Sequence, residues 1–336
     1  MQIAKKGIGT ARPNPSVGAV IVHQDMIIGE GFTAPYGGNH AEVNAINSVE
    51  DKSLLKEATL YVTLEPCSHF GKTPPCADLI VKHALKQVVI GCLDANSLVS
   101  GKGIERLKKA SIPVVLGVLE VECRIHHKRF FTVQEKKRPY IILKWAETKD
   151  GFVAPIKKVE NKPVFISNIY SQQLVHKLRS TEHAILVGTN TVLADNPKLN
   201  VRTWSGENPI RVVLDSALRV PDNSNVLDGS AKTILITATG NKKRTPKKNL
   251  IFEEIDFSEN IAKQICLVLN NHNIQSIIIE GGTQTLQSFI DENLWDEALV
   301  FVGDTSFQKG VKAPIIKKQF NEKLIKGDVL KRYTND

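Results

Sequence analysis

The amino-acid sequence predicts an α/β protein built from two domains, and three observations support that prediction. The chain has 336 residues, and since a globular domain usually has about 150 residues, the length favours two of them. Hydrophobic residues make up 42% of the chain and charged residues 24%, which is typical of a folded protein and excludes a disordered, collagen-like or coiled-coil chain. Runs rich in β-branched residues alternate with helical patterns along both halves, as in layered α/β domains.

In the first half, the predicted elements follow in the order β-β-α-β-α-β-α-β. The runs at 17–22 and 26–32 are joined by a short polar segment and predict a hairpin. Asn39 fits the N-cap of a helix over 40–49, and Pro74-Pro75 fits the start of a second helix over 76–85. The other predicted elements are strands over 58–67, 87–93 and 113–119 and a helix over 103–110.

The domain boundary is expected in the charged stretch 126–139, where lysine, arginine and proline interrupt the apolar pattern. We therefore predict a first domain over 1–138 and a second domain over 139–336. The second domain again alternates strands with helices. Its predicted strands cover 140–146, 184–189, 210–215, 232–238, 275–282 and 297–303, and its predicted helices cover 171–180, 261–270 and 283–294. The basic tract 240–250 is expected to be a solvated loop.

The charge of the chain is positive but evenly divided. There are 44 Lys and Arg residues against 35 Asp and Glu residues, a formal net charge of +9, which raises the question of a nucleic-acid partner. Up to Arg138 there are 18 basic and 13 acidic residues (+5), and after it there are 26 and 22 (+4), so neither part is a basic tail. We therefore expect phosphorylated small molecules as ligands and neither nucleic acid nor a membrane as a partner.

The cysteines and the apolar runs predict the compartment. Five cysteines at irregular spacings are too few for a disulfide framework, which indicates a reducing compartment. The first residues contain no apolar segment of a signal peptide, and no apolar run approaches the roughly 18 residues that a membrane helix needs. These features predict a cytoplasmic protein.

His40, Glu42, Cys67 and Cys76 form a candidate zinc site, since each lies next to an expected strand end or helix start. Catalytic zinc takes three protein ligands and leaves a fourth position to water, and one imidazole with two thiolates supplies three. Glu42 then remains for proton transfer. The pattern H-x-E followed by P-C-x-x-C is the signature of zinc-dependent base deaminases. Here the segment SHFGKTPP separates the two cysteines, and it either breaks the site or adds substrate-binding groups.

Four segments make the prediction more specific: PNPSVGAVIV, NHAEVNAI, TLEPCSHFGKTPPCADLI and DANSLVSGKGI. They resemble the deaminase half of the bifunctional deaminase/reductase family of riboflavin biosynthesis, in which the long cysteine spacing is itself characteristic. The resemblance implies a cytidine-deaminase-like three-layer domain. It also implies that His40, Cys67 and Cys76 bind Zn²⁺ and that Glu42 is the catalytic residue.

The same resemblance implies which residues bind the deaminase substrate. His69 and Lys72 lie between the two cysteines and suit a ribose phosphate. Asn14 would bind the pyrimidine edge, and Asp94 and Asn96 would hold the sugar-phosphate part. On the residues alone, Asn14 between two prolines could equally be a turn residue, and Asp94 could equally form an Asx turn.

Two segments of the second half suit a phosphate-bearing ligand. The Gly281-Gly282 pair lies between a predicted strand and a helix, where free backbone N–H groups and the positive helix end could bind a phosphate. A lone Gly-Gly after a strand is, however, more often a tight turn. The run 184–202 is a strand followed by a polar loop with Thr191, Asp195 and Arg202, and ligands of α/β proteins bind to such loops.

LKWAETKDG, HKLRS, ILVGTNTVLADNPKLNVR and IIIEGG resemble the reductase half of the same family. This resemblance implies a dihydrofolate-reductase-like α/β domain that uses NADPH. The implied cofactor-binding residues are Ala146, Phe165, Thr191, Asp195, Gly282, Thr283, Gln284, Thr285, Leu286, Gln287 and Ser288. The implied substrate-binding residues are Lys144, Ser167, Arg179, Leu199, Arg202 and Glu280. Arg179 and Arg202 suit a phosphate, although either one alone could form a surface salt bridge. Phe165 and Pro163 depart from the family, which usually has Trp and Ser there.

Taken together, the resemblance implies a bifunctional enzyme of riboflavin biosynthesis. The first step would be the zinc-dependent hydrolytic deamination of 2,5-diamino-6-(5-phosphoribosylamino)pyrimidin-4(3H)-one. The second step would be the NADPH-dependent reduction of the ribosyl side chain to ribityl. The resemblance also implies a homo-oligomer, either a dimer or a tetramer.

Two other classes of protein share some of these features. RNA-editing deaminases have the His-x-Glu pattern and a cysteine pair, but the long cysteine spacing, the second domain and the evenly divided charge argue against them. A reductase or regulator with an idle metal site is disfavoured because all three ligands and Glu42 are present.

Overall fold

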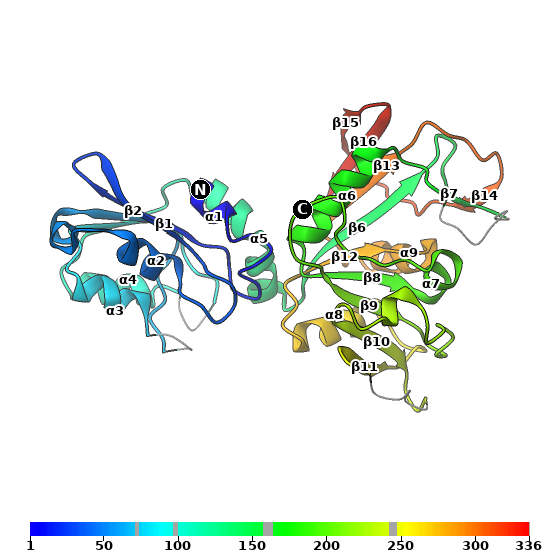
Figure 1. Cartoon of the computed structure of the whole chain (residues 1–336), viewed down its shortest axis with the longest axis horizontal. Helices are drawn as coiled ribbons and strands as arrows, with labels where there is room; N and C mark the ends of the chain where they lie inside the picture. The colour runs from blue at the N-terminus through cyan, green and yellow to red at the C-terminus, as the bar shows by residue number, and fades with distance from the viewer. Residues whose placement is uncertain (71–73, 97–99, 157–163, 242–246, 336) are drawn as a thin grey trace. The chain divides into compact units, whose positions relative to one another are not determined.

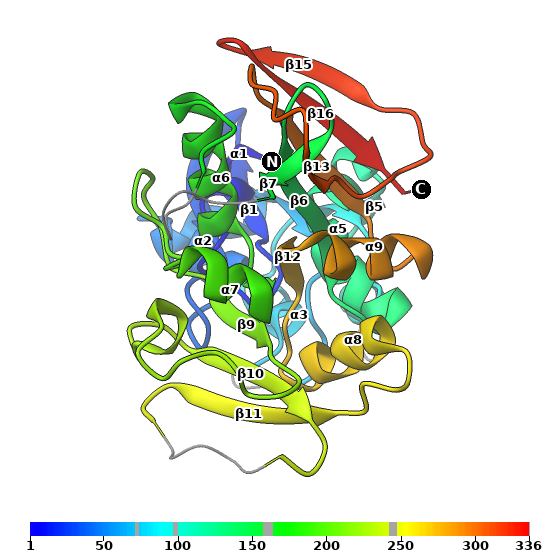
Figure 2. The same cartoon turned by 90° about the vertical axis from the view of Figure 1, so that its right-hand side faces the viewer.

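The computed structural model describes residues 1–70, 74–96, 100–156, 164–241 and 247–335. These residues form two compact units, Met1–Lys137 and Arg138–Asp336. Figure 1 colours the first unit blue to teal and the second green to red, and Figure 2 shows the same chain from another side. In the part of the chain that is described, no helix is both long and apolar enough to cross a membrane.

The first unit is built on a five-stranded sheet with the strand order β2-β1-β3-β4-β5. Its strands are β1 (Gly18–His23), β2 (Met26–Phe32), β3 (Thr59–Leu64), β4 (Gln87–Cys92) and β5 (Val114–Leu116). β1 pairs antiparallel with β2 and β3, whereas β3, β4 and β5 run parallel. The predicted hairpin is confirmed: Gln24 and Asp25 link β1 to β2 with φ of 47° and 59°, as in a type I′ turn.

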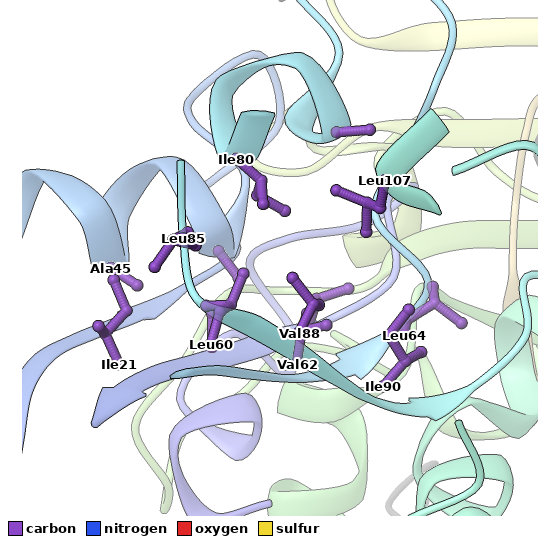
Figure 3. Close-up of a cluster of buried hydrophobic side chains, with 14 of the residues drawn as sticks. Ile21, Ala45, Leu60, Val62, Leu64, Ile80, Leu85, Val88, Ile90 and Leu107 are labelled. Carbon is purple, nitrogen blue, oxygen red and sulfur yellow. The ribbon is translucent and has the colours of Figure 1, made fainter. Parts of the chain in front are cut away.

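Helices cover both faces of this sheet and make three layers. They are α1 (Gln2–Lys5), α2 (Ala41–Ser48), the 3₁₀ helix η1 (Lys52–Glu57), α3 (Cys76–Lys82), α4 (Lys102–Lys109) and α5 (Glu120–Lys136). Figure 3 shows Ala45 of α2, Ile80 of α3 and Leu107 of α4 over one face of the strands, where they are fully buried. On the other face, a Cβ on Gly91 of β4 would lie 2.3 Å from Sγ of Cys123, so the absence of a side chain there lets α5 pack closely.

The start of α2 differs from the prediction. The N-cap residue is His40 rather than Asn39, and α2 begins at Ala41. The side chain of His40 makes no capping hydrogen bond and contacts Cys67 and Cys76 instead. The residue therefore takes the cap position without acting as a cap, because its imidazole is directed at the two cysteines.

The two units divide after Lys137, inside the stretch 126–139 in which the boundary was expected, but most of that stretch belongs to α5. The inner face of this helix carries the buried residues Cys123, His127, Phe130 and Phe131. The outer face carries charged residues such as Arg124 and Glu135 together with the exposed Val121 and Ile125, so the sequence is polar on average although one side of the helix is core.

The second unit is built on a nine-stranded sheet with the order β11-β10-β9-β8-β12-β6-β13-β16-β15. Every pair from β11 to β13 is parallel, and β16 and β15 add two antiparallel strands at one edge. The strands are β6 (Tyr140–Glu147), β8 (Ala184–Gly188), β9 (Ile210–Leu214), β10 (Thr233–Ala238), β11 (Leu250–Ile255), β12 (Ser276–Glu280), β13 (Glu297–Val302), β15 (Asn321–Ile325) and β16 (Asp328–Thr334). β7 (Phe152–Pro155) and β14 (Gly310–Lys312) pair separately.

Helices again cover both faces of the sheet. They are α6 (Ile169–Thr181), α7 (Thr189–Asp195), the 3₁₀ helix η2 (Asn225–Leu227), α8 (Ile261–Asn271) and α9 (Thr283–Asp291). Ile265 of α8 and Phe289 of α9 pack with Ile277 of β12 on one face. On the other face, Val192 of α7 packs with Ile278. Because β6, β8 and β12 are parallel, their carboxyl ends meet at one edge, where ligands of α/β sheets bind.

Two segments of the second unit differ from the prediction. The polar segment after β8 is the short helix α7 rather than a loop, because Val192 is apolar and anchors it to the sheet. The tract 240–250 was expected to be a loop; residues 242–246 lie outside the described residues, and Leu250 begins β11.

Candidate active sites

His40, Cys67 and Cys76 come from different elements and converge. His40 precedes α2, Cys67 follows β3, and Cys76 is the first residue of α3. Nδ1 of His40 lies 3.5 Å from Sγ of Cys67 and 3.3 Å from Sγ of Cys76, and all three ligand atoms lie within 4.8 Å of one another. The long segment between the cysteines therefore does not separate the predicted metal ligands.

The geometry and chemistry of these residues fit a tetrahedral zinc ion. With Zn–N of about 2.0 Å and Zn–S of about 2.3 Å, a tetrahedral ion separates a nitrogen ligand from a sulfur ligand by about 3.5 Å. Hydrogen bonds from Cys76 and His40 lower the pKa of the Cys67 thiol well below its usual range. The thiolate, which is the form that binds zinc, is thus favoured at this position.

Glu42 lies in the first turn of α2 and is 4% exposed. Burial, reinforced by the negative charge of Cys67, raises the pKa of its carboxyl to about 7. A carboxyl with a pKa near neutrality can both accept and return a proton. The arrangement therefore suits a general acid and base beside the three ligands.

A cavity of about 270 Å³ opens beside these residues. It brings together seven residues of the predicted deaminase site: Asn14, His40, Glu42, Cys67, His69, Asp94 and Asn96. Cys76 is fully buried at the same metal cluster. Lys72, which was also predicted to bind substrate, lies outside the described residues.

For Asn14 and Asp94, the two interpretations left open by the sequence turn out to be compatible. The backbone N–H of Asn14 donates to the carbonyl of Ala11 at 3.0 Å, as in a turn, and Asn14 lines the cavity. Oδ1 of Asp94 accepts from the N–H of Asn96 at 2.7 Å, which is an Asx turn, and both residues line the cavity. Burial raises the pKa of Asp94 to about 6.

The cavity also contains residues that sequence reasoning missed. They are Pro15, Val17, Thr33, Tyr36, Gly37, Gly38, Leu64, Glu65 and Phe130. Glu65 is a buried carboxylate directly before the Pro66-Cys67 pair. A carboxylate at the end of a buried strand, next to a metal ligand, was the signal that could have singled it out.

In the second unit, three predicted substrate-binding residues form a buried charge cluster. Lys144 of β6 stands opposite Glu280 of β12 in the sheet register, with Nζ and Oε1 3.7 Å apart. Nη2 of Arg179 from α6 donates to Oε2 of Glu280 at 2.8 Å. The Arg179 side chain is only 11% exposed, so this pair is not a surface salt bridge.

The segment that contains Asn200 and Arg202 makes hydrogen bonds to residues of α6. The guanidinium of Arg202 is exposed and donates to Oδ1 of Asn200 at 2.8 Å. Its backbone N–H donates to Nδ1 of His176 at 3.2 Å, and Arg179 donates to the carbonyl of Asn200 at 3.3 Å. His176, which lies one helical turn before Arg179, was missed by the sequence analysis. Burial lowers its pKa to about 4, so the imidazole stays neutral and can accept this hydrogen bond.

The remaining predicted substrate residues differ in exposure. Leu199 is buried in a core cluster with Val192. Ser167 is half-buried, and its carbonyl accepts from the side chain of Gln172 at 2.9 Å.

Ala146, Thr191 and Gly282, which were predicted to bind the cofactor, lie at or just after the ends of β6, β8 and β12. Gly282 is the N-cap of α9, and a Cβ on it would meet no atom within 4 Å, so the backbone faces open space as a phosphate site requires. Of the rest of α9, Thr283, Gln284 and Thr285 form the first turn, whereas Leu286 is fully buried in the core. The side chains of Gln287 and Ser288 hydrogen-bond within or next to the helix.

The other predicted cofactor residues lie on α7, on β6 and before α6. Thr191 and Asp195 are half-buried on α7, and Ala146 is half-buried near the end of β6. Phe165 is 67% exposed. The open backbone at Gly282 and the polar residues of α7 fit a phosphate-bearing dinucleotide at this edge.

Comparison with protein families identifies both units. Residues 1–92 match the cytidine and deoxycytidylate deaminase zinc-binding region, and residues 139–307 match the RibD C-terminal domain. With the metal-ligand cluster in one unit and the charged sheet edge in the other, the chain belongs to the class of bifunctional deaminase/reductases.

Individual relatives make the assignment specific. The riboflavin biosynthesis protein RibD of Aquifex aeolicus is 41% identical over 313 residues, which cover 93% of this chain and 86% of the relative. RibD of Escherichia coli is 33% identical over 318 residues, covering 90% and 85%. A crystal structure of a diaminohydroxyphosphoribosylaminopyrimidine deaminase/5-amino-6-(5-phosphoribosylamino)uracil reductase from Thermotoga maritima superimposes with a TM-score of 0.87 at 36% identity, covering 98% and 95%. The chain belongs to the RibD family of riboflavin biosynthesis.

This assignment confirms the predicted fold class and general function. The first unit is a cytidine-deaminase-like three-layer domain, and the second is a dihydrofolate-reductase-like α/β domain. The protein is a bifunctional deaminase and reductase of riboflavin biosynthesis.

Proposed function

We propose that the first unit hydrolytically deaminates 2,5-diamino-6-(5-phosphoribosylamino)pyrimidin-4(3H)-one with zinc, and that the second unit then reduces the ribosyl side chain to ribityl with NADPH. The observation that carries the proposal is the cluster of His40, Cys67 and Cys76, whose ligand atoms lie within 4.8 Å of one another beside the buried Glu42. The cavity of about 270 Å³ next to them has room for a pyrimidine ring and includes polar residues in its lining.

In the deamination, His40, Cys67 and Cys76 hold the metal. Zinc, when bound, provides a nucleophile from water at neutral pH. The Glu42 carboxyl, with a pKa raised to about 7 by burial, accepts a proton from the nucleophile and returns one to the departing ammonia. Its burial keeps other water from competing for that proton.

The substrate is oriented by the polar residues of the cavity. Asn14 offers an amide that can both donate to and accept from the pyrimidine edge. His69, Asp94 and Asn96 lie further along the lining and bind the ribose phosphate. We include Lys72, which lies outside the described residues, because it follows His69 by three positions in the sequence and an ammonium suits a phosphate.

In the reduction, the charged cluster at the sheet edge receives the substrate. Glu280 fixes Arg179 and Lys144 through contacts of 2.8 Å and 3.7 Å, so that their positive groups are held in place before the ligand arrives. Arg179 and Arg202 bind the phosphate, and Lys144 and Glu280 orient the ribosyl group, with Ser167 and Leu199 beside them. Because the ion pairs hold these side chains in place before the substrate binds, less conformational entropy is lost on binding.

NADPH fits the other side of the same edge and supplies the hydride. The N-terminus of α9 binds a phosphate of the cofactor through the backbone N–H groups that precede Thr285, the residue whose N–H begins the bonds within the helix by donating to the carbonyl of Gly282. Ala146, Phe165, Thr191 and Asp195 line the rest of its site.

The deamination is tested by ammonia release from the diaminopyrimidine phosphate. Removal of zinc by a chelator, or Glu42→Gln, should abolish ammonia release while NADPH oxidation with the deaminated substrate continues. The reductase activity of the same chain is the matched control for folding and concentration. Undiminished ammonia release in either case would contradict the proposal, and deamination of RNA with salt-dependent binding would favour the RNA-editing alternative.

The reduction is tested by following the nicotinamide absorbance. Gly282→Asp places a negative charge at the proposed phosphate site and should abolish NADPH oxidation, whereas Gly282→Ala should retain it because the new Cβ meets no atom within 4 Å. Equal turnover of Gly282→Asp and wild type would argue against this cofactor site.

We also propose a cytoplasmic homo-oligomer, either a dimer or a tetramer, that binds no nucleic acid or membrane. The free state of all five cysteines agrees with a reducing compartment. Light scattering of the purified protein tests the oligomeric state, and a monomer would contradict it.

A further inference from the structure

Glu65 is a buried carboxylate at the point where two parallel strands end. It directly follows β3, and Asp94 follows the neighbouring strand β4. Because parallel strands end at the same edge of a sheet, residues far apart in the sequence come together there. Glu65 is 3% exposed and also lines the deaminase cavity.

Both oxygens of Glu65 accept hydrogen bonds from backbone N–H groups. Oε2 accepts from Asp94 at 3.3 Å and from Gly101 at 3.0 Å. Oε1 accepts from Gly103 at 2.9 Å and from Ile104 at 3.3 Å. Gly103 and Ile104 lie in the first turn of α4, where backbone N–H groups have no partner within the helix. One side chain thus joins Asp94, two residues after β4, to the start of α4.

This connection fixes the backbone at two polar residues of the cavity lining, Asp94 and Asn96. Glu65 holds Asp94 by its backbone, and Asp94 in turn accepts from the N–H of Asn96 at 2.7 Å. Both residues line the cavity. Four backbone N–H groups stabilise the Glu65 carboxylate, so the side chains of Asp94 and Asn96 are not its partners.

The same carboxylate sits close to the metal cluster without belonging to it. A Cβ on Gly103 would lie 2.1 Å from the carbonyl oxygen of Pro66, so the first turn of α4 packs directly against the residue before Cys67. His40, Cys67 and Cys76 contact one another independently of Glu65. A change at Glu65 therefore acts first on the segment from Asp94 to α4.

We propose that Glu65 is a positioning residue for the deamination, which sets Asp94 and Asn96 against the sugar-phosphate end of the substrate. It acts through backbone hydrogen bonds and does not itself touch the reacting atoms. The inference rests on the proposed function of the cavity and assigns the residue that fixes the backbone at two polar residues of its lining.

Glu65→Gln in the full-length chain tests the proposal. Glutamine keeps the shape but replaces one acceptor oxygen by an NH₂ group, so two of the four N–H groups face a donor. We expect KM for the diaminopyrimidine phosphate to rise about tenfold or more while kcat changes less than threefold. Bound zinc and NADPH-dependent reduction should remain at wild-type levels.

A second readout does not depend on activity. Amide hydrogen exchange of Asp94, Gly101 and Gly103 should accelerate in Glu65→Gln, because these N–H groups lose their acceptor or its charge. Leu107→Ala is the matched control: it lies on α4 and is fully buried, so it destabilises the helix without removing the carboxylate. It should lower the melting temperature and leave KM unchanged.

The outcomes separate this proposal from the proposed function. Unchanged amide exchange, unchanged KM, a loss of zinc, or an equal rise of KM in Leu107→Ala would each overturn the role of Glu65. Absence of deamination by the wild-type chain would instead overturn the proposed function. The amide-exchange result would then still decide whether Glu65 holds the N–H groups of Asp94, Gly101 and Gly103. If Glu65→Gln lacks reductase activity, the variant has failed to fold and Glu65→Asp is used in its place. Aspartate has a shorter side chain that cannot reach the same N–H groups. A wild-type KM together with wild-type amide exchange in Glu65→Asp would refute the proposal.

Discussion

Glu280→Gln is the substitution whose effect follows most directly from the structure. The side chains of Lys144, Arg179 and Glu280 are 15%, 11% and 13% exposed, so water screens their charges weakly. Glutamine keeps the size of the side chain and removes the negative charge. The two buried cations then lack their common partner, which is a costly arrangement in a protein interior.

The size of the effect can be worked out from the pKa of Glu280. Burial would raise this pKa, but Arg179 and Lys144 outweigh it and lower the pKa from 4.5 to about 2. At 1.36 kcal/mol per unit, the charged form stabilises the folded unit by about 3 kcal/mol at pH 7. The lowered pKa means that this contribution is complete above about pH 4.5 and is lost as the pH falls towards 2. At pH 3.5 about 2 kcal/mol of it remains.

Urea unfolding of the full-length chain measures this difference. All three tryptophans, Trp145, Trp204 and Trp295, lie in the second unit, so their fluorescence follows that unit alone. We expect Glu280→Gln to lower the free energy of unfolding by about 3 kcal/mol at pH 7 and by about 2 kcal/mol at pH 3.5. The exposed Glu322→Gln is the control and should change it by less than about 0.5 kcal/mol. A loss below about 1 kcal/mol, or the same loss at both pH values, would refute the reasoning.

Three further predictions address the other parts of the sites. Cys67→Ser should lose bound zinc, measured by elemental analysis, and lower ammonia release by at least about 100-fold, because a serine hydroxyl binds zinc poorly; full zinc occupancy would contradict it. Gly103→Ala should lower the free energy of unfolding of the first unit by about 1–3 kcal/mol in urea titrations followed by circular dichroism, since its Cβ would lie 2.1 Å from the carbonyl oxygen of Pro66. Arg202→Met should raise KM of the reductase about tenfold at unchanged kcat in NADPH-oxidation assays, and a fall in kcat alone would assign Arg202 another role.

The metal site was predictable because each of its residues belongs to a short local pattern. His40 and Glu42 share one helix start, and Cys67 and Cys76 each follow a proline at the edge of an element. Chain geometry alone then brings them together. Glu65 was not predictable in the same way, because its partners are backbone N–H groups 29 to 39 residues away, and a backbone amide leaves no mark on the sequence.

The elements of the fold were predictable where burial is two-sided. β12, with three consecutive isoleucines, is buried on both faces and stands out in the sequence. β15 and β16 were not predicted, because they lie at one edge of the sheet and their short apolar pairs stand next to charged residues such as Lys323, Lys331 and Arg332. Their apolar pattern is too weak to recognise without the pairing partner.

The order of strands in the second unit has a consequence for synthesis of the chain on the ribosome. β6 is the first strand of this unit to be made, yet it lies between β12 and β13 and pairs with Ser276–Glu280 and Glu297–Val302. The apolar segment YIILKWA of β6 therefore has no neighbouring strand to pair with until nearly the whole unit has emerged from the ribosome. The five-stranded sheet of the first unit lies within Met1–Lys137, so that unit can fold before the second unit has been synthesised. We expect nascent chains that end before β12 to need chaperones, while their deaminase unit is already folded.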